Sequence, residues 1–173
     1  MGKTRVLLTD DHMLFRQAIR TLLSAEADLE VVGEAATASE AVTLAHELRP
    51  DVVLMDIGMA GMSSFEATRQ IRQDRPETRV LFLSMYDDEE YLAESMEIGA
   101  SGYVLKDSPA EQLVTGIREV HRGGSYLSPR LLTRLVNGFR AQSRAGAERQ
   151  PRFGMLTKRE REILKMLAEG QSV

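Results

Sequence analysis

Cysteine is absent from this 173-residue sequence, and no long apolar run stands at its amino terminus. Without cysteine the chain can form neither a disulfide nor a thiolate metal site, which is typical of a reducing compartment. Only three consecutive apolar residues precede Thr9, whereas a signal peptide or a membrane span needs many more. Internal repeats and low-complexity segments are absent too. We therefore expect a cytoplasmic globular protein without a membrane segment.

The net charge of −4 conceals a division along the chain. Residues 1–125 carry 12 Lys and Arg against 22 Asp and Glu, whereas residues 126–173 carry 10 against 4. Such asymmetry suggests an acidic regulatory part joined to a part that meets a polyanion. Ordinary solvation of a linker and one amphipathic helix by arginine explains it equally well.

Short apolar runs of strand character alternate with helical stretches through the first 125 residues. The runs are 5–9, 29–33, 51–55, 79–83 and 102–105. Helices between consecutive strands make the strands parallel. We therefore predict an α/β fold with a doubly wound, five-stranded parallel sheet, ordered 2-1-3-4-5.

The intervening helices show apolar residues at helical spacing and recognisable ends. The predicted helices cover 13–26, 38–48, 64–73, a stretch from Asp87 to Gly99, and one from Ser108 to Gly123. The first should bury Leu14 and Ala18 together with the other apolar residues of that face. Ser108 should cap the last, because Pro109 follows it at the first turn.

Five polar residues stand where four of these strands end. They are Asp10, Asp11, Asp56, Ser84 and Lys106. Because parallel strands end at one edge of a sheet, these side chains should meet in the crevice where the strand order reverses. A lone Asp at a strand end is usually a helix cap and a Lys there is usually on the surface, but four such ends together favour a functional site.

This set of groups suits a divalent cation and a phosphoryl group. Neighbouring carboxylates repel one another unless a cation lies between them, and oxygen ligands favour Mg²⁺. Lys106 supplies a compact charge for phosphate oxygens and Ser84 a hydroxyl donor. A carboxylate can itself accept a phosphoryl group. We assign that role to Asp56, because the adjacent pair Asp10-Asp11 is better suited to holding the metal.

The carboxyl-terminal part has a different character. Ser128-Pro129 opens a helix with apolar residues at helical spacing, residues 141–154 resemble a flexible basic linker, and another helix starts at Thr157. We predict three parts: a phosphoacceptor domain over 1–125, a linker with one helix over 126–154, and the first helix of another domain over 155–173.

These motifs together resemble the two-component response regulators of the NarL/FixJ branch, which have a LuxR-type helix-turn-helix output. The matching segments are Asp10-Asp11-His12, Leu54-Met-Asp-Ile-Gly-Met59, Ser84, Tyr103-Val-Leu-Lys106 and Leu156-Thr-Lys-Arg-Glu-Arg-Glu-Ile-Leu164. The resemblance covers essentially the whole chain. It implies a flavodoxin-like receiver followed by the start of an all-α DNA-binding domain.

The same resemblance implies roles for single residues. A sensor histidine kinase would phosphorylate Asp56, and Mg²⁺ would bind Asp11, Asp56 and the backbone carbonyl of Gly58, with Asp10 acting through water. Lys106 would pair with the phosphoryl group. Ser84 would move to bond it, and Tyr103 would turn inward as the second switch residue.

The resemblance also implies partners. Phosphorylation would favour a homodimer, and the full-length protein would bind promoter DNA. This sequence stops at Val173, before a recognition helix, so we expect no specific DNA binding from it alone.

The loop after Asp56 departs from the family pattern. It reads Met59-Ala-Gly-Met-Ser-Ser64 and lacks the usual proline at position 60, so it should be looser. Gly58 carries no side chain over the site, so water can approach, and we expect a short-lived phosphoryl group. His12 should be a surface or supporting residue rather than a metal ligand.

Two other classes of protein remain as alternatives. An aspartyl phosphatase or phosphotransferase commonly has a second acid two residues after its nucleophile, where this chain has Gly58. A flavin-binding module would need a hydroxyl-rich phosphate loop after the first strand, where Asp10-Asp11 would repel phosphate.

Overall fold

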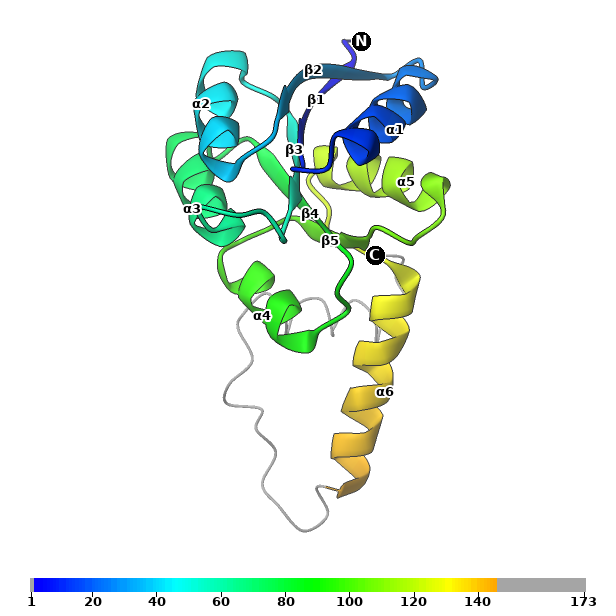
Figure 1. Ribbon diagram of the computed structural model, residues 1–173. Coiled ribbons are helices and arrows are strands. Elements are labelled where there is room, and N and C mark those ends of the chain that lie inside the picture. Colours follow the sequence, from blue (N-terminus) through cyan, green and yellow to red (C-terminus); the bar gives the residue numbers. More distant parts are fainter. Residues whose placement is uncertain (1, 146–173) are drawn as a thin grey trace.

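The computed structural model of the chain describes residues 2–145 and the exposure of side chains for residues 2–141 (Figure 1). The predicted linker beyond residue 145 and the predicted helix within 155–173 lie outside the described residues. The strands are β1 (Thr4–Thr9), β2 (Leu29–Ala35), β3 (Val52–Asp56), β4 (Arg79–Ser84), β5 (Gly102–Leu105) and β6 (Tyr126–Leu127). The helices are α1 (Met13–Ser24), α2 (Ala38–Leu48), α3 (Ser64–Asp74), α4 (Glu89–Glu97), α5 (Ala110–His121) and α6 (Pro129–Ala145).

All strands pair in parallel, in the order β2-β1-β3-β4-β5-β6. The predicted order 2-1-3-4-5 is confirmed, but the strand count is wrong by one, since β6 extends the edge beyond β5. The chain reverses its direction of winding between β1 and β3. The carboxyl ends of these two neighbouring strands therefore flank one crevice.

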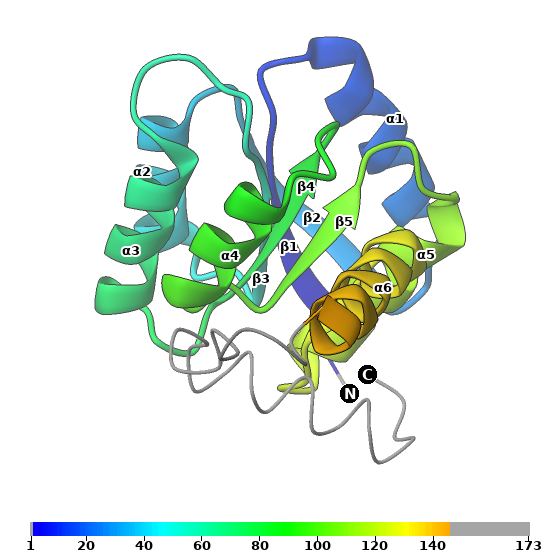
Figure 2. The same cartoon turned by 90° about the horizontal axis from the view of Figure 1, so that it is seen from below.

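Helices cover both faces of the sheet (Figures 1 and 2). Helices α1 and α5 enclose one apolar core, built around Leu23, Leu54 and Ile117. Helices α2, α3 and α4 enclose the other, built around Met55 and Phe82. The central strands are buried on both sides, which explains why they read as continuous apolar runs.

The start of α1 differs from the prediction. Its inner face buries Ile19 and Leu23, but Leu14 is 81% exposed and Ala18 is also exposed. Met13 in the same turn is 62% exposed as well, so the start of the helix is not covered. Helical spacing predicted the correct inner face of α1, but not how far along the helix that face is covered.

The β5–α5 loop holds a second difference. Helix α5 begins at Ala110 after Pro109, without a side-chain cap. The hydroxyl of Ser108 instead lies 3.2 Å from that of Ser128. The predicted cap is wrong because a partner distant in the sequence takes the hydroxyl.

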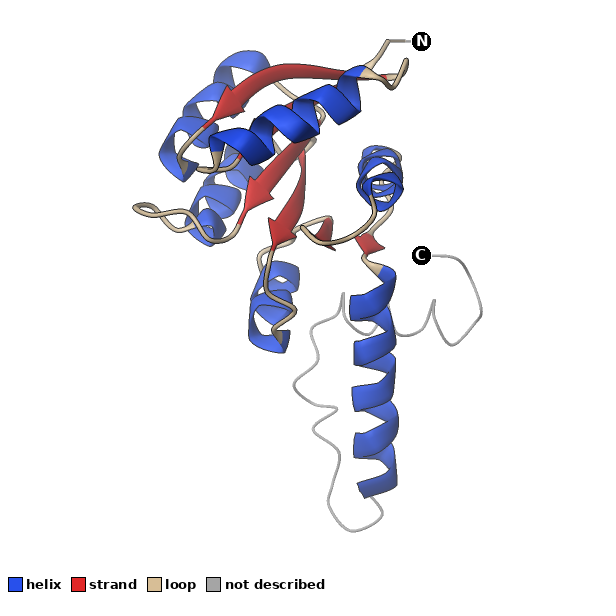
Figure 3. Cartoon of the chain, turned by 45° about the vertical axis from the view of Figure 1, so that its right-hand side comes forward, coloured by secondary structure: helices blue, strands red, loops and turns tan. Residues whose placement is uncertain are grey.

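The sheet continues past residue 125 into the carboxyl-terminal helix. Gly102 pairs with Tyr126 and Tyr103 with Leu127. Leu131, in the first turn of α6, is 2% exposed and joins the core under α4. The rest of α6 runs away from the sheet (Figures 1 and 3). Its first turn is therefore anchored in the core, while its later turns project from the domain.

Candidate functional site

The strand ends position the site residues. Asp10 directly follows β1, Asp56 ends β3, Ser84 ends β4 and Lys106 directly follows β5. Asp10 and Asp56 are each 3% exposed and Ser84 is 1% exposed, whereas Asp11 is exposed. The strand ladder fixes their order across the edge, because Asp56 pairs with Leu83 and Ser84 with Leu105.

Lys106 joins the two buried carboxylates. Its Nζ lies 2.5 Å from Oδ2 of Asp10 and 3.1 Å from Oδ1 of Asp56. The three side chains are only 4–6% exposed. One buried ammonium thus faces two carboxylates, so this part of the site carries a net negative charge that a further cation can neutralise.

The surroundings of Asp56 disfavour the ionised form of its carboxyl group. Burial and then the charge of Asp10 raise the pKa of Asp56, against the lowering effect of Lys106. A carboxyl group whose pKa is raised holds its proton more strongly, so its ionised form gains from any cation placed beside it. A divalent ion there would reverse the direction of the shift.

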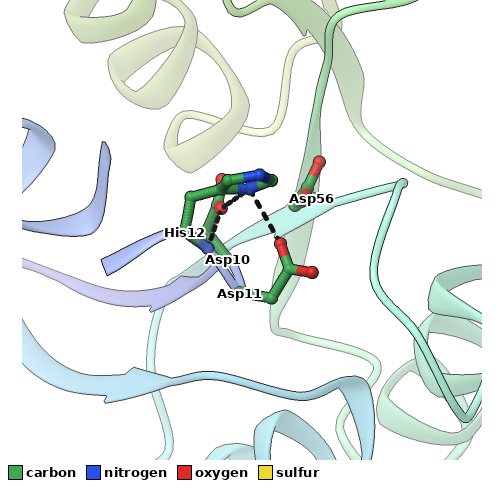
Figure 4. Close-up of side chains that lie close together, drawn as sticks. All are labelled: Asp10, Asp11, His12 and Asp56. Atoms are coloured by element: carbon green, nitrogen blue, oxygen red, sulfur yellow. Dashed lines mark hydrogen bonds and ion pairs between the residues drawn. The ribbon is translucent and has the colours of Figure 1, made fainter. Parts of the chain in front are cut away.

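An acidic cluster lies where β1 and β3 end (Figure 4). One ligand atom from each of Asp10, Asp11, His12 and Asp56 can be chosen so that all lie within 4.8 Å of one another. His12 Nδ1 lies 2.9 Å from Oδ1 of Asp11 and 3.2 Å from Oδ1 of Asp10. Three carboxylates supply the hard oxygen ligands that Mg²⁺ prefers, so the residues present fit that ion. The imidazole is 71% exposed and stands outside the buried pair.

Gly58 lies beside the Asp56 carboxylate and carries no side chain that could cover it. Its N–H donates to Oδ1 of Asp56 at 3.3 Å. A Cβ atom at this position would lie 3.9 Å from both carboxylate oxygens. A side chain at this position would therefore start in contact with the carboxylate, and glycine adds no such cover.

Ser84 and Tyr103 belong to one hydrogen-bonded unit with the β4–α4 loop. The Ser84 hydroxyl accepts from the N–H of Tyr86 at 2.9 Å, and the Tyr103 hydroxyl donates to the carbonyl of Tyr86 at 2.8 Å. The Tyr103 ring is fully buried, and burial raises the pKa of Tyr103 to about 12, against a lowering hydrogen bond with Ser84. In this structure the ring already points inward.

Two residues of α1 that the motif analysis did not single out contact the site. The Phe15 ring lies 4.6 Å below Nζ of Lys106, measured to its centroid. Arg16 donates to the backbone carbonyl of Asp10. The available signal was their position in the chain. A helix that starts at Met13, shortly after the acidic pair, brings its third and fourth residues back over the strand end. Sequence spacing does not reveal which way the helix leans.

The comparisons with known proteins agree with this geometry. Residues 6–118 match the model of the response regulator receiver domain. The chain belongs to the two-component response regulators. The receiver family consists of signalling regulators, and its fold is the parallel α/β sheet found here.

Similar proteins extend along nearly the whole chain. The oxygen regulatory protein NreC of Staphylococcus epidermidis is 41% identical over 169 residues, which is 96% of this response regulator and 78% of that protein. A LuxR-family two-component response regulator from Aurantimonas is 36% identical, with a TM-score of 0.76 over 79% of this chain and 98% of that chain. The receiver domain of NarL from Mycobacterium tuberculosis is 34% identical, with a TM-score of 0.69 over 71% and 99%.

The relatives fit the NarL and LuxR branch that the motifs indicated. The regulator matches LuxR-family proteins over its receiver domain. Among the residues that the structure describes, no helix has both the length and the apolar character that a membrane crossing requires.

Proposed function

We propose that this response regulator accepts a phosphoryl group on Asp56 from a sensor histidine kinase, with Mg²⁺ held by Asp10, Asp11, Asp56 and the carbonyl of Gly58. The observation that carries the proposal is the buried pair Asp10 and Asp56 bridged by Lys106. A carboxylate in this position has a cation beside it, and the neighbouring Gly58 adds no side chain over it.

The transfer needs one bond made and one broken. An Asp56 carboxylate oxygen attacks phosphorus, the bond from phosphorus to the kinase imidazole nitrogen breaks, and that nitrogen leaves with its electron pair and takes up a proton. Bound Mg²⁺ would neutralise charge on the phosphoryl oxygens. Lys106 stays within reach of the oxygens on the product, because its Nζ already lies 3.1 Å from Oδ1 of Asp56.

The lifetime of the phosphoryl group follows from the glycine beside Asp56. Gly58 places no side chain beside the Asp56 carboxylate, so we expect water to reach the phosphorus of a phosphoryl group there. We infer hydrolysis within minutes rather than days. A half-life of many hours in the isolated protein would contradict this inference, whereas Gly58→Leu should lengthen the half-life by covering the carboxylate.

The hydrogen bonds around Tyr86 make Ser84 and Tyr103 the proposed switch residues. A phosphoryl oxygen near Ser84 competes for its hydroxyl, which at present accepts from the N–H of Tyr86. Movement of Ser84 toward the phosphoryl group would therefore free this N–H and shift the β4–α4 loop. Tyr103 is held by the same loop through the Tyr86 carbonyl, so the two residues respond together.

Helix α6 contacts the two loops that follow the switch residues. Arg130 lies 2.8 Å from Asp107 and 3.1 Å from Asp87, and Arg134 lies 2.9 Å from Asp87. The Ser128 hydroxyl accepts from the N–H of Leu105 at 3.0 Å. A shift of the β4–α4 loop therefore changes contacts of the helix that continues toward the carboxyl end. This supports a path from Asp56 to a carboxyl-terminal output.

The output of the full-length protein is proposed to be phosphorylation-dependent dimerisation and promoter binding, which regulate transcription. The support is the kinship with LuxR-family regulators. An aspartyl phosphatase remains the competing reading, and Gly58 in place of a second acid disfavours it. Turnover of a free phosphoester would favour it again.

Intact-mass spectrometry tests the proposed chemistry. Wild type and Asp56→Asn are incubated with acetyl phosphate, each with Mg²⁺ and with EDTA. We expect an adduct of one phosphoryl group on wild type with Mg²⁺ and none in the other three samples. An equal adduct on Asp56→Asn would mean that another residue is the acceptor.

A further inference from the structure

Arg16 is a charged residue of α1 whose side chain is largely withdrawn from solvent. Its side chain is only 15% exposed. One end of the guanidinium, Nη1, donates to the backbone carbonyl of Asp10, and Nε lies 3.5 Å from Oε2 of Glu34 on β2. The planar guanidinium thus links the end of β1 with the neighbouring strand β2.

The carbonyl that Arg16 holds belongs to the peptide group joining Asp10 to Asp11. Peptide groups are planar, so fixing this carbonyl also fixes the direction in which the chain enters Asp11. The Asp10 N–H is already held by the carbonyl of Ala35 at 3.1 Å. The Asp10 carboxylate accepts from the N–H of His12 at 2.8 Å. The Arg16 side chain adds a restraint on the carbonyl of Asp10 itself.

Glu34 balances the charge of Arg16 from the opposite side of the guanidinium, as an ion pair at 3.5 Å. Arg20, one turn further along α1, pairs with the same carboxylate. The pairing of Arg20 with Glu34 does not involve Asp10, and the Arg20 side chain is 58% exposed. The two arginines therefore share a partner but differ in their relation to Asp10, which makes Arg20 a matched control.

We propose that Arg16 is a positioning residue that orients Asp11 for magnesium by holding the carbonyl of Asp10. This inference rests on the proposed function, because it takes Asp11 as a magnesium ligand. Arg16 does not touch the metal or the phosphoryl group. Its role has the character of an outer-shell contact, which fixes a ligand without binding the ion.

The sign of the effect separates positioning from simple electrostatics. Arg16 is positive, so if it acted only through its charge, its removal would strengthen the binding of another cation nearby. If it acts by holding the turn, its removal lets the Asp10–Asp11 peptide rotate and weakens binding. The two explanations predict opposite changes in the dissociation constant for Mg²⁺.

The test is calorimetric titration of Mg²⁺ into the folded protein at constant ionic strength and neutral pH. We expect Arg16→Met to raise the dissociation constant about tenfold, as loss of an outer-shell contact typically does. Arg20→Met should change it by less than about twofold, since that exposed charge is screened by salt. Arg16→Lys keeps the positive charge and loses the planar guanidinium, so it should weaken Mg²⁺ binding too. This variant also serves as the test if Arg16→Met does not fold.

Unchanged or tighter Mg²⁺ binding in both Arg16 variants would overturn the inference, as would an Arg20→Met effect equal to that of Arg16→Met. Uptake of phosphate from acetyl phosphate at saturating Mg²⁺ is measured on the same samples. Wild type that binds Mg²⁺ but gains no phosphate would refute the proposed function and leave the positioning role standing. Wild type that does not bind Mg²⁺ would overturn both.

Discussion

Replacing Lys106 by methionine removes the ammonium between the two buried carboxylates and keeps an unbranched stem over the Phe15 ring. The Nζ distances of 2.5 and 3.1 Å correspond to attractions of ~5–7 kcal/mol each at an effective dielectric constant of about 20. Desolvation of the three groups offsets much of this attraction. Removing one partner of a buried pair typically costs ~3–5 kcal/mol, which we take as the expected loss of unfolding free energy.

The pH dependence of this loss follows from Asp56. Its pKa is already raised in the folded protein, and without Lys106 it rises further. A group with a raised folded pKa binds more protons in the folded state than in the unfolded one. Its contribution to stability therefore falls as pH rises above its ordinary value of 3.8. The Lys106→Met variant should lose most stability at neutral pH and recover part of it on acidification.

Urea unfolding at pH 7 and pH 5 without magnesium measures this loss, with Lys3→Met as the control because Lys3 is exposed. Magnesium provides a second measurement. A divalent and a monovalent cation about 4 Å apart repel by ~2 kcal/mol even in bulk water, so Lys106→Met should bind Mg²⁺ about thirtyfold more tightly. A variant as stable as the control at pH 7, with unchanged Mg²⁺ affinity, would refute the electrostatic reasoning.

Three further substitutions test other parts of the structure. Asp56→Asn should raise the melting temperature without Mg²⁺ at neutral pH, because it removes a carboxylate whose ionised form is disfavoured there. This gain in melting temperature should vanish below the ordinary carboxyl pKa. A lower melting temperature of the variant at pH 7 would contradict the prediction. Gly102→Ala places a Cβ atom 2.4 Å from a carbonyl of β6, so it should cost about 1–3 kcal/mol in urea unfolding, whereas Gly2→Ala, with nothing within 4 Å, should be neutral. Leu131→Ala should lower the free energy of unfolding by about 2–5 kcal/mol because α6 begins in the core. Leu14→Ala should change it by under about 0.5 kcal/mol. Equal effects of these two substitutions would mean that α6 is not anchored.

The central sheet could be predicted from sequence because its strands are buried on both faces and appear as apolar runs. The short strand β6 could not, because Tyr126 and Leu127 are too few to show a period. Their pairing depends on Gly102, which leaves room for the β6 carbonyl. The exposure of Leu14 was missed for a related reason: periodicity locates a face, and only the neighbouring elements decide how much of it is covered.

The strand-end residues of the site were predictable because parallel strands deliver their carboxyl ends to one edge. Position in the chain therefore placed Asp10, Asp56 and Lys106 in one crevice before any distance was known. The contacts of Phe15 and Arg16 were not predictable in this way. They depend on the angle at which α1 crosses the sheet, and the packing of the whole helix sets that angle.

The most direct test of the central claim is a crystal structure of the protein with Mg²⁺ and beryllofluoride, a mimic of the phosphoryl group. The account predicts beryllofluoride on an Asp56 carboxylate oxygen, with Lys106 and Ser84 on its fluorine atoms and Mg²⁺ on Asp11 and Asp56. An adduct on another residue, or an unmodified Asp56 at saturating Mg²⁺ and beryllofluoride, would contradict it.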